Sequence, residues 1–224
     1  MKKTLCLVLL AGCAAGPRAI PRGTSAADRL KASEDILAHA PKLNATFDVS
    51  SQGENAGTFK GTLALLEENK LKLTGEGSFK GEYAYVELDS RDGAITRTST
   101  KGPTANTHRD LPAPALREAL VLGLVRMGLM HNLVTLSRDE SVEKRDGGFD
   151  AWVKAGEVRA GGADNVDGVA CTRVDFSVLV EGNNMGDTSL CIADQTGLPV
   201  LRTSTMHFPS GDMKLTEKFT WTLP

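Results

Sequence analysis

Aromatic residues are scarce in this sequence, at 5% of the chain, and neither sign of charge dominates, with 26 basic and 28 acidic side chains. Surfaces that bind nucleic acid usually combine clustered basic residues with aromatic side chains that stack on bases. No such cluster occurs, so we expect no nucleic-acid partner. The chain also lacks an uncharged apolar run of about 18 residues, the length that marks a membrane-spanning helix.

Residues that could form a catalytic or metal centre are few and scattered. The four histidines, at positions 39, 108, 131 and 207, show no H-E-x-x-H spacing and no close grouping with acids or cysteines. The G-x-S-x-G turn of serine hydrolases is absent. Residues 87–93 only faintly resemble a calcium loop, because Arg91 interrupts the ligand spacing. We therefore predict a protein that is not an enzyme and uses no metal or cofactor.

The N-terminus has the pattern of an export signal. Lys2 and Lys3 precede an apolar run at 5–10, and small residues follow it, so residues 1–12 are predicted to be a signal peptide. The quartet Leu10-Ala11-Gly12-Cys13 resembles the bacterial lipobox, whose cysteine is acylated and becomes the mature N-terminus. The alternative is an ordinary signal peptide with an incidental cysteine.

The residues after Cys13 indicate where the mature protein is attached. Ala14 follows the cysteine where an aspartate would retain a lipoprotein at the inner membrane, so we predict a lipid anchor in the outer membrane of a Gram-negative bacterium, on its periplasmic face. Several acyl chains on Cys13 would make this attachment effectively permanent. Residues 13–23 contain Pro17 and Pro21 and are predicted to form a flexible tether.

Two further cysteines suit an oxidising compartment. Cys171 and Cys191 lie in two predicted antiparallel strands on either side of a turn at 181–184. The apolar face of the first strand is formed by Val174, Phe176 and Val178, which leaves both sulfurs on the polar face at similar distances from the turn. A structural disulfide between Cys171 and Cys191 is therefore predicted.

The remaining pattern is mostly that of β-strands. Ser25-Ala-Ala-Asp28 is a plausible capping box for a helix that ends near Ala40. Beyond it, apolar residues alternate with polar ones, and turn signals separate the runs. The alternating positions include Phe47, Val49, Phe59, Leu63, Leu65, Leu71, Leu73, Tyr83 and Tyr85. Later strands are predicted at 142–144, at 149–153, around the two cysteines, at 200–208 and at 213–221. The predicted fold is α+β, with a curved antiparallel sheet of about eleven strands forming an incomplete barrel.

The segment over residues 115–136 interrupts this pattern and is predicted to be a helix. It is apolar on two nearly opposite sides, so most of its circumference should be buried. One interpretation is a core helix packed on one face of the sheet. The other is a lid or plug over the concave face, covering a cavity that can take acyl chains instead. Gly123 and Gly128 would let such a helix break or shift.

The plug interpretation predicts a set of cavity-lining residues from both sides. From the helix they are Leu116, Leu120, Met127, Met130 and Val134. From the sheet they are Phe47, Phe59, Leu63, Leu73, Tyr85, Val174 and Phe176.

Two turns suggest a known family. Residues 165–171, Asn-Val-Asp-Gly-Val-Ala-Cys, precede a strand, and residues 194–199, Asp-Gln-Thr-Gly-Leu-Pro, join two strands through a tight turn in which Gly197 is free to take positive φ. Together with the order of elements, they resemble the LolA and LolB lipoprotein carriers and the LppX-type lipid-binding lipoproteins. The resemblance implies that residues 24–224 form an unclosed half-barrel with a hydrophobic cavity under helices.

Two functions of different classes follow. The first is an anchored lipoprotein that binds lipid or the acyl chains of another lipoprotein under helix 115–136, as in lipid or lipoprotein transport. The second is a structural or interaction lipoprotein with a filled core, whose partner is another envelope protein.

Overall fold

The computed structural model describes residues 16–53, 55–66, 70–91, 94–99, 105–110, 120, 123–131, 133 and 152–223. Several predictions concern residues outside these ranges. They are the lipidation site Cys13, the lining residues Leu116 and Val134, and the strand at 142–144. In chain order the elements are α1 (Ala26–His39), β1 (Leu43–Gly53), β2 (Gly57–Leu65), β3 (Leu71–Phe79), β4 (Glu82–Arg91), β5 (Ala94–Ser99), β6 (Ala105–Asp110), the π-helical turn η2 (Gly123–Met127), β7 (Val153–Ala155), β8 (Arg159–Val166), β9 (Val169–Val180), β10 (Asn183–Ala193), β11 (Pro199–Phe208) and β12 (Gly211–Thr222).

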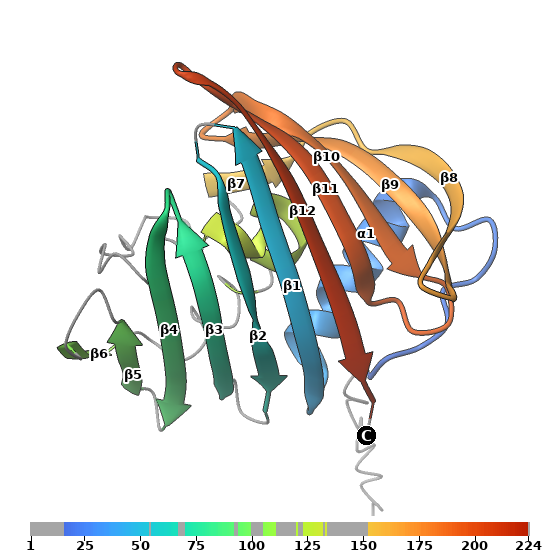
Figure 1. The fold of residues 1–224 in the computed structure, drawn as a ribbon. Coiled ribbons are helices and arrows are strands. Elements are labelled where there is room, and N and C mark those ends of the chain that lie inside the picture. Colours follow the sequence, from blue (N-terminus) through green and yellow to red (C-terminus); the bar gives the residue numbers. More distant parts are fainter. Residues whose placement is uncertain are drawn as a thin grey trace, which may run out of the picture.

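The strands form one twelve-stranded sheet in the order β6-β5-β4-β3-β2-β1-β12-β11-β10-β9-β7, with β8 also paired to β9. Neighbouring strands are antiparallel, and β1 joins the two halves of the chain by pairing with β12. Within the described residues, β6 and β7 end the order, so the barrel is incomplete. The sheet curves around α1 and η2, which lie together on its inner, concave face (Figure 1). The predicted fold class is confirmed.

Helix α1 forms for the local reasons that its sequence suggests. The Ser25 hydroxyl oxygen accepts a hydrogen bond from the backbone N–H of Asp28 at 3.1 Å and donates one to the Asp28 carboxylate at 2.6 Å. Leu30, Ile36 and Leu37 form a buried stripe against the sheet. The helix ends where Ala40 N–H bonds to the Ile36 carbonyl at 2.8 Å, just before Pro41.

The hairpin turns use residues with positive φ. Three turns, Lys80-Gly81, Asp167-Gly168 and Glu181-Gly182, have positive φ at both positions, which is the two-residue geometry that suits the twist of a hairpin. Gly197 has a φ of +70°, as predicted. A side chain there would also collide with Ile36 of α1, so this turn and the helix pack closely.

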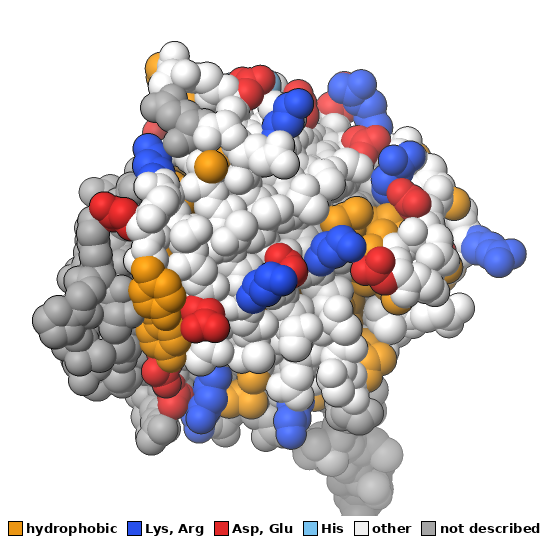
Figure 2. Space-filling model, in the orientation of Figure 1, with side chains coloured by type: hydrophobic (Ala, Val, Ile, Leu, Met, Phe, Trp, Pro, Cys, Tyr) orange, Lys and Arg blue, Asp and Glu red, His pale blue; other side chains and the backbone are white. Residues whose placement is uncertain are grey.

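The outer face of the sheet is polar. Thr62 and Thr74 share a hydrogen bond of 2.8 Å across β2 and β3, and Lys60 pairs with Asp48 at 3.0 Å. Figure 2 views the molecule as in Figure 1, with this face toward the reader, and charged side chains are scattered over it. The alternation of apolar and polar residues along these strands accounts for this polar face.

In β4, the prediction assigned the wrong set of alternating residues to the inner face of the sheet. Residues 83–86 are apolar in both phases, but Glu87 and Asp89 continue the phase of the tyrosines. The structure buries Ala84, Val86 and Leu88 instead of the tyrosines. The tight turn at Lys80-Gly81 fixes the register so that Val86 faces Gly75 on the inner side. Tyr83 is 60% exposed, and the Tyr85 hydroxyl donates to Glu87 at 3.2 Å. Tyr85 therefore does not face the predicted cavity.

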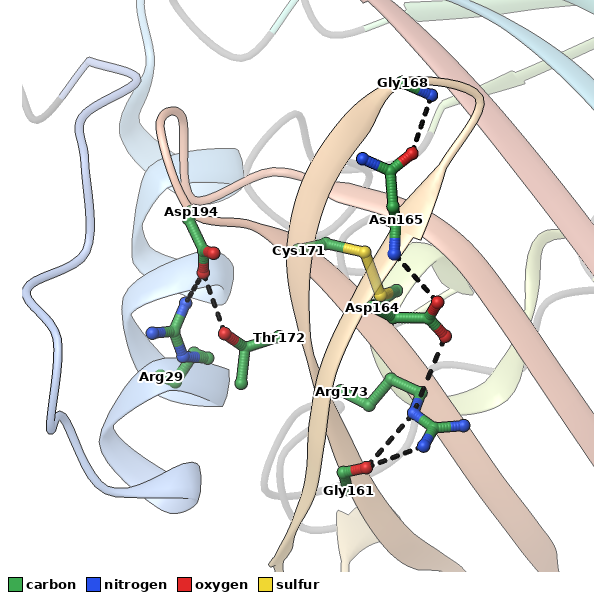
Figure 3. Close-up of a disulfide and its surroundings, with 10 residues drawn as sticks. Arg29, Gly161, Asp164, Asn165, Gly168, Cys171, Thr172, Arg173 and Asp194 are labelled. Atoms are coloured by element: carbon green, nitrogen blue, oxygen red, sulfur yellow. Dashed lines mark hydrogen bonds and ion pairs between the residues drawn. A yellow bond between two sulfur atoms is a disulfide. The ribbon is translucent and has the colours of Figure 1, made fainter.

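The predicted disulfide is confirmed, but its surroundings differ from the prediction. Cys171 of β9 and Cys191 of β10 are bonded, with 5.6 Å between their Cα atoms. They lie on the side of these strands away from Val174, as expected, yet both are buried. Val166 of β8 and Trp221 pack on this side, which Ala193 and Val200 also help to fill. Figure 3 shows the disulfide with polar neighbours from segments distant in sequence, among them Arg29 with Asp194 and Asp164 with Arg173.

Candidate functional site

The segment predicted as one helix is broken in the structure. We call its described part, Leu120 with residues 123–131 and 133, the broken segment. Turn η2 ends at Met127, Gly128 has a φ of +100°, and helical geometry resumes at 129–131 and 133. The predicted break at a glycine is confirmed, whereas a continuous helix over 115–136 is not, because a φ of +100° cannot continue a right-handed helix.

The apolar side chains of the broken segment fill the inner face. Each of them is at most 6% exposed except Met127, which packs at the edge of the same cluster. The buried ones are Leu120, Leu124, Val125, Leu129, Met130 and Leu133. This burial on more than one side agrees with the two apolar stripes of the sequence.

The sheet beneath the broken segment is shaped to receive it. A Cβ atom on Gly75 would lie 3.2 Å from both Leu133 Cδ2 and the Phe47 ring. A Cβ atom on Gly61 would collide with the same ring. Two glycines on neighbouring strands therefore let Phe47 lie flat across the sheet and let Leu133 approach the backbone.

The structure brings most of the predicted lining residues into one cluster. Leu120, Met127 and Met130 of the broken segment contact a cluster that contains six of the predicted sheet residues. These six are Phe47, Phe59, Leu63, Leu73, Val174 and Phe176. Tyr85 is the predicted residue that the structure places on the opposite side of the sheet.

At the centre of this apolar face lies a buried ion pair that the sequence analysis did not predict. Arg202 of β11 and Glu217 of β12 are both 0% exposed, with 3.5 Å between Arg202 Nη1 and Glu217 Oε2. Arg202 Nη2 donates to the carbonyl oxygen of Arg126 at 2.7 Å and to the Thr188 hydroxyl at 3.1 Å. Glu217 Oε1 accepts from the backbone N–H of Met130 at 2.8 Å.

Arg202 and Glu217 form hydrogen bonds with the backbone on both sides of the break at Gly128. A helical turn ends with unpaired carbonyls and begins with unpaired N–H groups. Arg202 binds a carbonyl of the turn that ends at Met127, and Glu217 binds an N–H of the turn that follows Gly128. Each charge also has the sign that the adjacent helix end favours. We call Arg202 and Glu217 the inner clamp.

Burial dominates the electrostatics of the inner clamp, so the pKa of Glu217 lies above its usual value and the pKa of Arg202 below its usual value. Burial raises the pKa of Glu217, while Arg202 and the backbone N–H groups of Met130 and Leu129 lower it. Burial likewise lowers the pKa of Arg202, and Glu217 opposes that shift. Among the described residues, Arg202 Nε, Arg202 Nη1 and Glu217 Oε2 find no hydrogen-bond partner. Charges buried in this way cost several kcal/mol when they lose their partners.

Gly128 is required for the clamp to reach the backbone. A Cβ atom there would lie 2.7 Å from Arg202 Nη1 and 3.1 Å from Glu217 Oε1. Its positive φ also disfavours any other residue.

A second ion pair holds the broken segment from the side. Arg126 Nε and Nη2 donate to the two carboxylate oxygens of Glu34 in α1 at 2.6 and 2.9 Å, and Nη1 donates to the Val153 carbonyl at 2.8 Å. Both side chains are about 15% exposed. We call Arg126 and Glu34 the outer clamp. Beside it, the exposed His131 ring lies 6.5 Å from the Trp152 ring, so His131 is a rim residue.

The inner clamp had a signal in the sequence. Glu217 stands between Leu215 and Phe219 in the buried phase of β12, and Arg202 stands in the inward phase of β11 with Ser204 and Met206. A charge in the apolar phase of a strand needs a partner. Two such exceptions of opposite sign on successive strands indicate a pair. What they bind could not be read from this pattern.

No protein-family model matches the chain, and no curated protein matches it. Among solved structures, LppX of Mycobacterium tuberculosis is similar over 89% of this chain and 96% of its own, with 13% identity and a TM-score of 0.47. MucB of Pseudomonas aeruginosa, solved with MucA, is similar over 88% of this chain, with 14% identity and a TM-score of 0.44. This chain spans 57% of the MucB chain.

A LolA superfamily protein of Nitrosomonas europaea is similar over 90% of this chain and 94% of its own, with 6% identity and a TM-score of 0.32. LppX and LolA are the groups that the sequence resembles.

Two kinds of feature are not found among the described residues. None of the helices in those ranges is long and apolar enough to cross a membrane. The same ranges hold no group of three or more histidine, cysteine or acidic side chains arranged to bind a metal ion.

Proposed function

We propose that this protein is a lipid-anchored envelope protein that binds an amphiphilic lipid, or the acyl chains of a lipoprotein, in place of the broken segment. The observation that carries the proposal is the inner clamp. Arg202 and Glu217 hold the segment by two backbone groups around a glycine break, so the segment is attached at a few polar points over an apolar face.

The free energy needed to expose the broken segment is comparable to the free energy gained by burying acyl chains in its place. Burying six apolar side chains contributes roughly 9–18 kcal/mol at about 1.5–3 kcal/mol each. An acyl chain of about 16 carbons contributes roughly 12 kcal/mol at about 0.8 kcal/mol per methylene. One chain therefore offsets much of the cost of exposing the side chains of the broken segment when it moves, and two chains exceed that cost.

The inner clamp sets the chemistry of the ligand's polar end. A ligand that displaces the segment must replace the Arg126 carbonyl and the Met130 N–H, or leave two buried charges without them. The pair is neutral overall, so a charged head group would add an unbalanced charge. An amide or hydroxyl, which supplies both an acceptor and a donor, fits best.

The anchor belongs to the same proposal. Cys13 carries the lipid, the first 12 residues are the signal peptide, and residues 24–224 form the binding domain on the periplasmic face of the outer membrane. The Leu10-Ala11-Gly12-Cys13 quartet and Ala14 support this location. The disulfide agrees with an oxidising compartment.

One observation favours the second function, an interaction lipoprotein with a filled core. The described apolar side chains of the broken segment are already almost fully buried, apart from Met127. In that case the inner clamp fixes the core, and the segment does not leave it.

Weakening the outer clamp separates the two functions. Residues 14–224 are exported behind an ordinary signal peptide and tested by native mass spectrometry and displacement of a fluorescent fatty amide. Glu34→Gln removes the charge that holds Arg126, so the segment should open more often and the affinity for dodecanamide should rise about threefold or more. Glu157→Gln, which breaks an exposed pair with Arg159, is the matched control and should change nothing.

A matched series of 12-carbon ligands tests the polar end. Dodecanamide and dodecanol should compete about tenfold better than dodecane or dodecanoate in the wild type. If neither wild type nor Glu34→Gln takes up any of these ligands, the core is permanently filled and the interaction protein is the better function.

A further inference from the structure

The chain just after the proposed lipidation site is attached to one end of the sheet. Arg18 N–H donates to the Thr196 carbonyl at 3.1 Å, and Ile20 N–H donates to the Asp194 carbonyl at 3.0 Å. The Ile20 side chain is buried. The C-terminal part of the segment predicted as a flexible tether is therefore docked on the β10–β11 turn, and only the residues before Arg18 can act as a tether.

The docked segment marks one end of the molecule, which we call the anchor end. It comprises the β10–β11 turn at 194–198, the β8–β9 turn at Asp167-Gly168, and Leu223 after β12. The pairing of Cys171 with Ala193 brings the first two turns together, and Trp221 Nε1 donates to the Pro199 carbonyl at 2.6 Å. The β9–β10 and β11–β12 turns lie at the opposite end of these strands (Figure 1).

The anchor end also carries the side chains that suit a lipid surface. Three large apolar residues are conspicuously exposed among those described, and two of them, Val169 at 42% and Leu223 at 43%, lie at this end. Arg18 and Arg22, in the docked segment, are exposed as well. Basic side chains near apolar ones favour the surface of a membrane with anionic lipids.

The short stretch of chain between Cys13 and the docked segment limits how far the anchor end can lie from the membrane. Five residue steps separate Cys13 from Arg18, which is at most roughly 18 Å of extended chain. Strands of about 12 residues are roughly 40 Å long. A lipid on Cys13 thus keeps the anchor end close to the bilayer, while the far end can lie a strand's length away.

We propose that the anchor end faces the bilayer, with Val169, Leu223, Arg18 and Arg22 against the lipid head groups. The β9–β10 and β11–β12 turns then point into the periplasm. This inference rests on the proposed acylation of Cys13 and is independent of ligand binding under the broken segment.

The test uses the full-length lipoprotein in vesicles of phosphatidylethanolamine and phosphatidylglycerol that contain a rhodamine-labelled lipid. An NBD dye is attached at Val169→Cys in one sample and at Ser210→Cys, in the β11–β12 turn, in another. Energy transfer to the membrane should be about twofold or more stronger from position 169. Inserting about ten Gly and Ser residues between Gly16 and Pro17 should reduce the transfer from 169 and shrink the difference.

Equal transfer from both positions, or stronger transfer from 210, would overturn the orientation. Palmitate labelling of the same preparations separates this failure from failure of the anchor. A labelled chain with equal transfer refutes the orientation alone, whereas a chain without label refutes the anchor and the orientation that depends on it. Neither result bears on ligand binding by the domain, which the 12-carbon ligands test separately.

Discussion

Helix α1 and the broken segment lie on the same face of the same sheet, yet they are held there by different means. Helix α1 starts at its own cap, presents a regular apolar stripe and ends at a proline. The broken segment is split at Gly128 and depends on Arg202 and Glu217, which lie more than 70 residues further along the chain. The start and end of α1 are set locally, although its buried Arg29 also pairs with the distant Asp194 at 2.9 Å. The break in the broken segment is held by distant residues.

The difference predicts where each element is vulnerable. Changes close to α1 in sequence should affect α1, whereas the broken segment should respond to changes in β11 and β12. The two elements also meet, because the outer clamp joins Glu34 to Arg126. A perturbation of either clamp therefore tests whether the broken segment behaves as core or as a detachable plug.

The largest effect is expected from removing one member of the inner clamp. Glu217→Leu leaves the Arg202 charge buried without its partner and the Met130 N–H without its acceptor, so it should lower the free energy of unfolding by about 3–5 kcal/mol. The double variant with Arg202→Met should cost less than the sum of the single changes, because both charges leave together. Urea unfolding of the four proteins measures this coupling.

Hydrogen exchange locates the damage. In Glu217→Leu the amides of Leu129 and Met130 should exchange faster, while the amides of α1 keep their protection. Loss of protection in both elements alike would contradict the distinction between them.

A smaller loss is expected at the break itself. Gly128→Ala meets both a positive φ and the crowding of Arg202 Nη1, and it should cost about 2–4 kcal/mol. Gly168→Ala is the matched control, since its φ of +88° is similar but a Cβ atom there meets nothing within 4 Å. That variant should cost about 1 kcal/mol. Equal losses in thermal unfolding would mean that crowding at the inner clamp contributes nothing.

These two helical elements also explain how far the sequence could predict the structure. Strand periodicity, the Ser25 cap and the turn at Gly197 are local signals, so the fold class, α1 and the disulfide could be predicted. In β4 the tyrosines share their phase with Glu87 and Asp89, so a local signal for an outward Tyr85 was present in the sequence, and the register with β3 agrees with it. The cover over the disulfide and the partners of Arg202 and Glu217 are contacts between distant segments, which periodicity does not encode.

The smallest effect is expected at the N-terminal cap of α1. This change tests whether α1 depends on residues close to it in sequence. Ser25→Ala removes the acceptor of the Asp28 N–H and should lower the free energy of unfolding by about 1 kcal/mol. Ser25→Asp keeps an acceptor at the same position and should restore most of that stability. Exchange of the Asp28 and Arg29 amides should accelerate in Ser25→Ala, while Met130 N–H, held by Glu217, should be unaffected. If the Met130 amide also lost protection, the broken segment would depend on the start of α1, and the outer clamp at Glu34 would be the connection to examine.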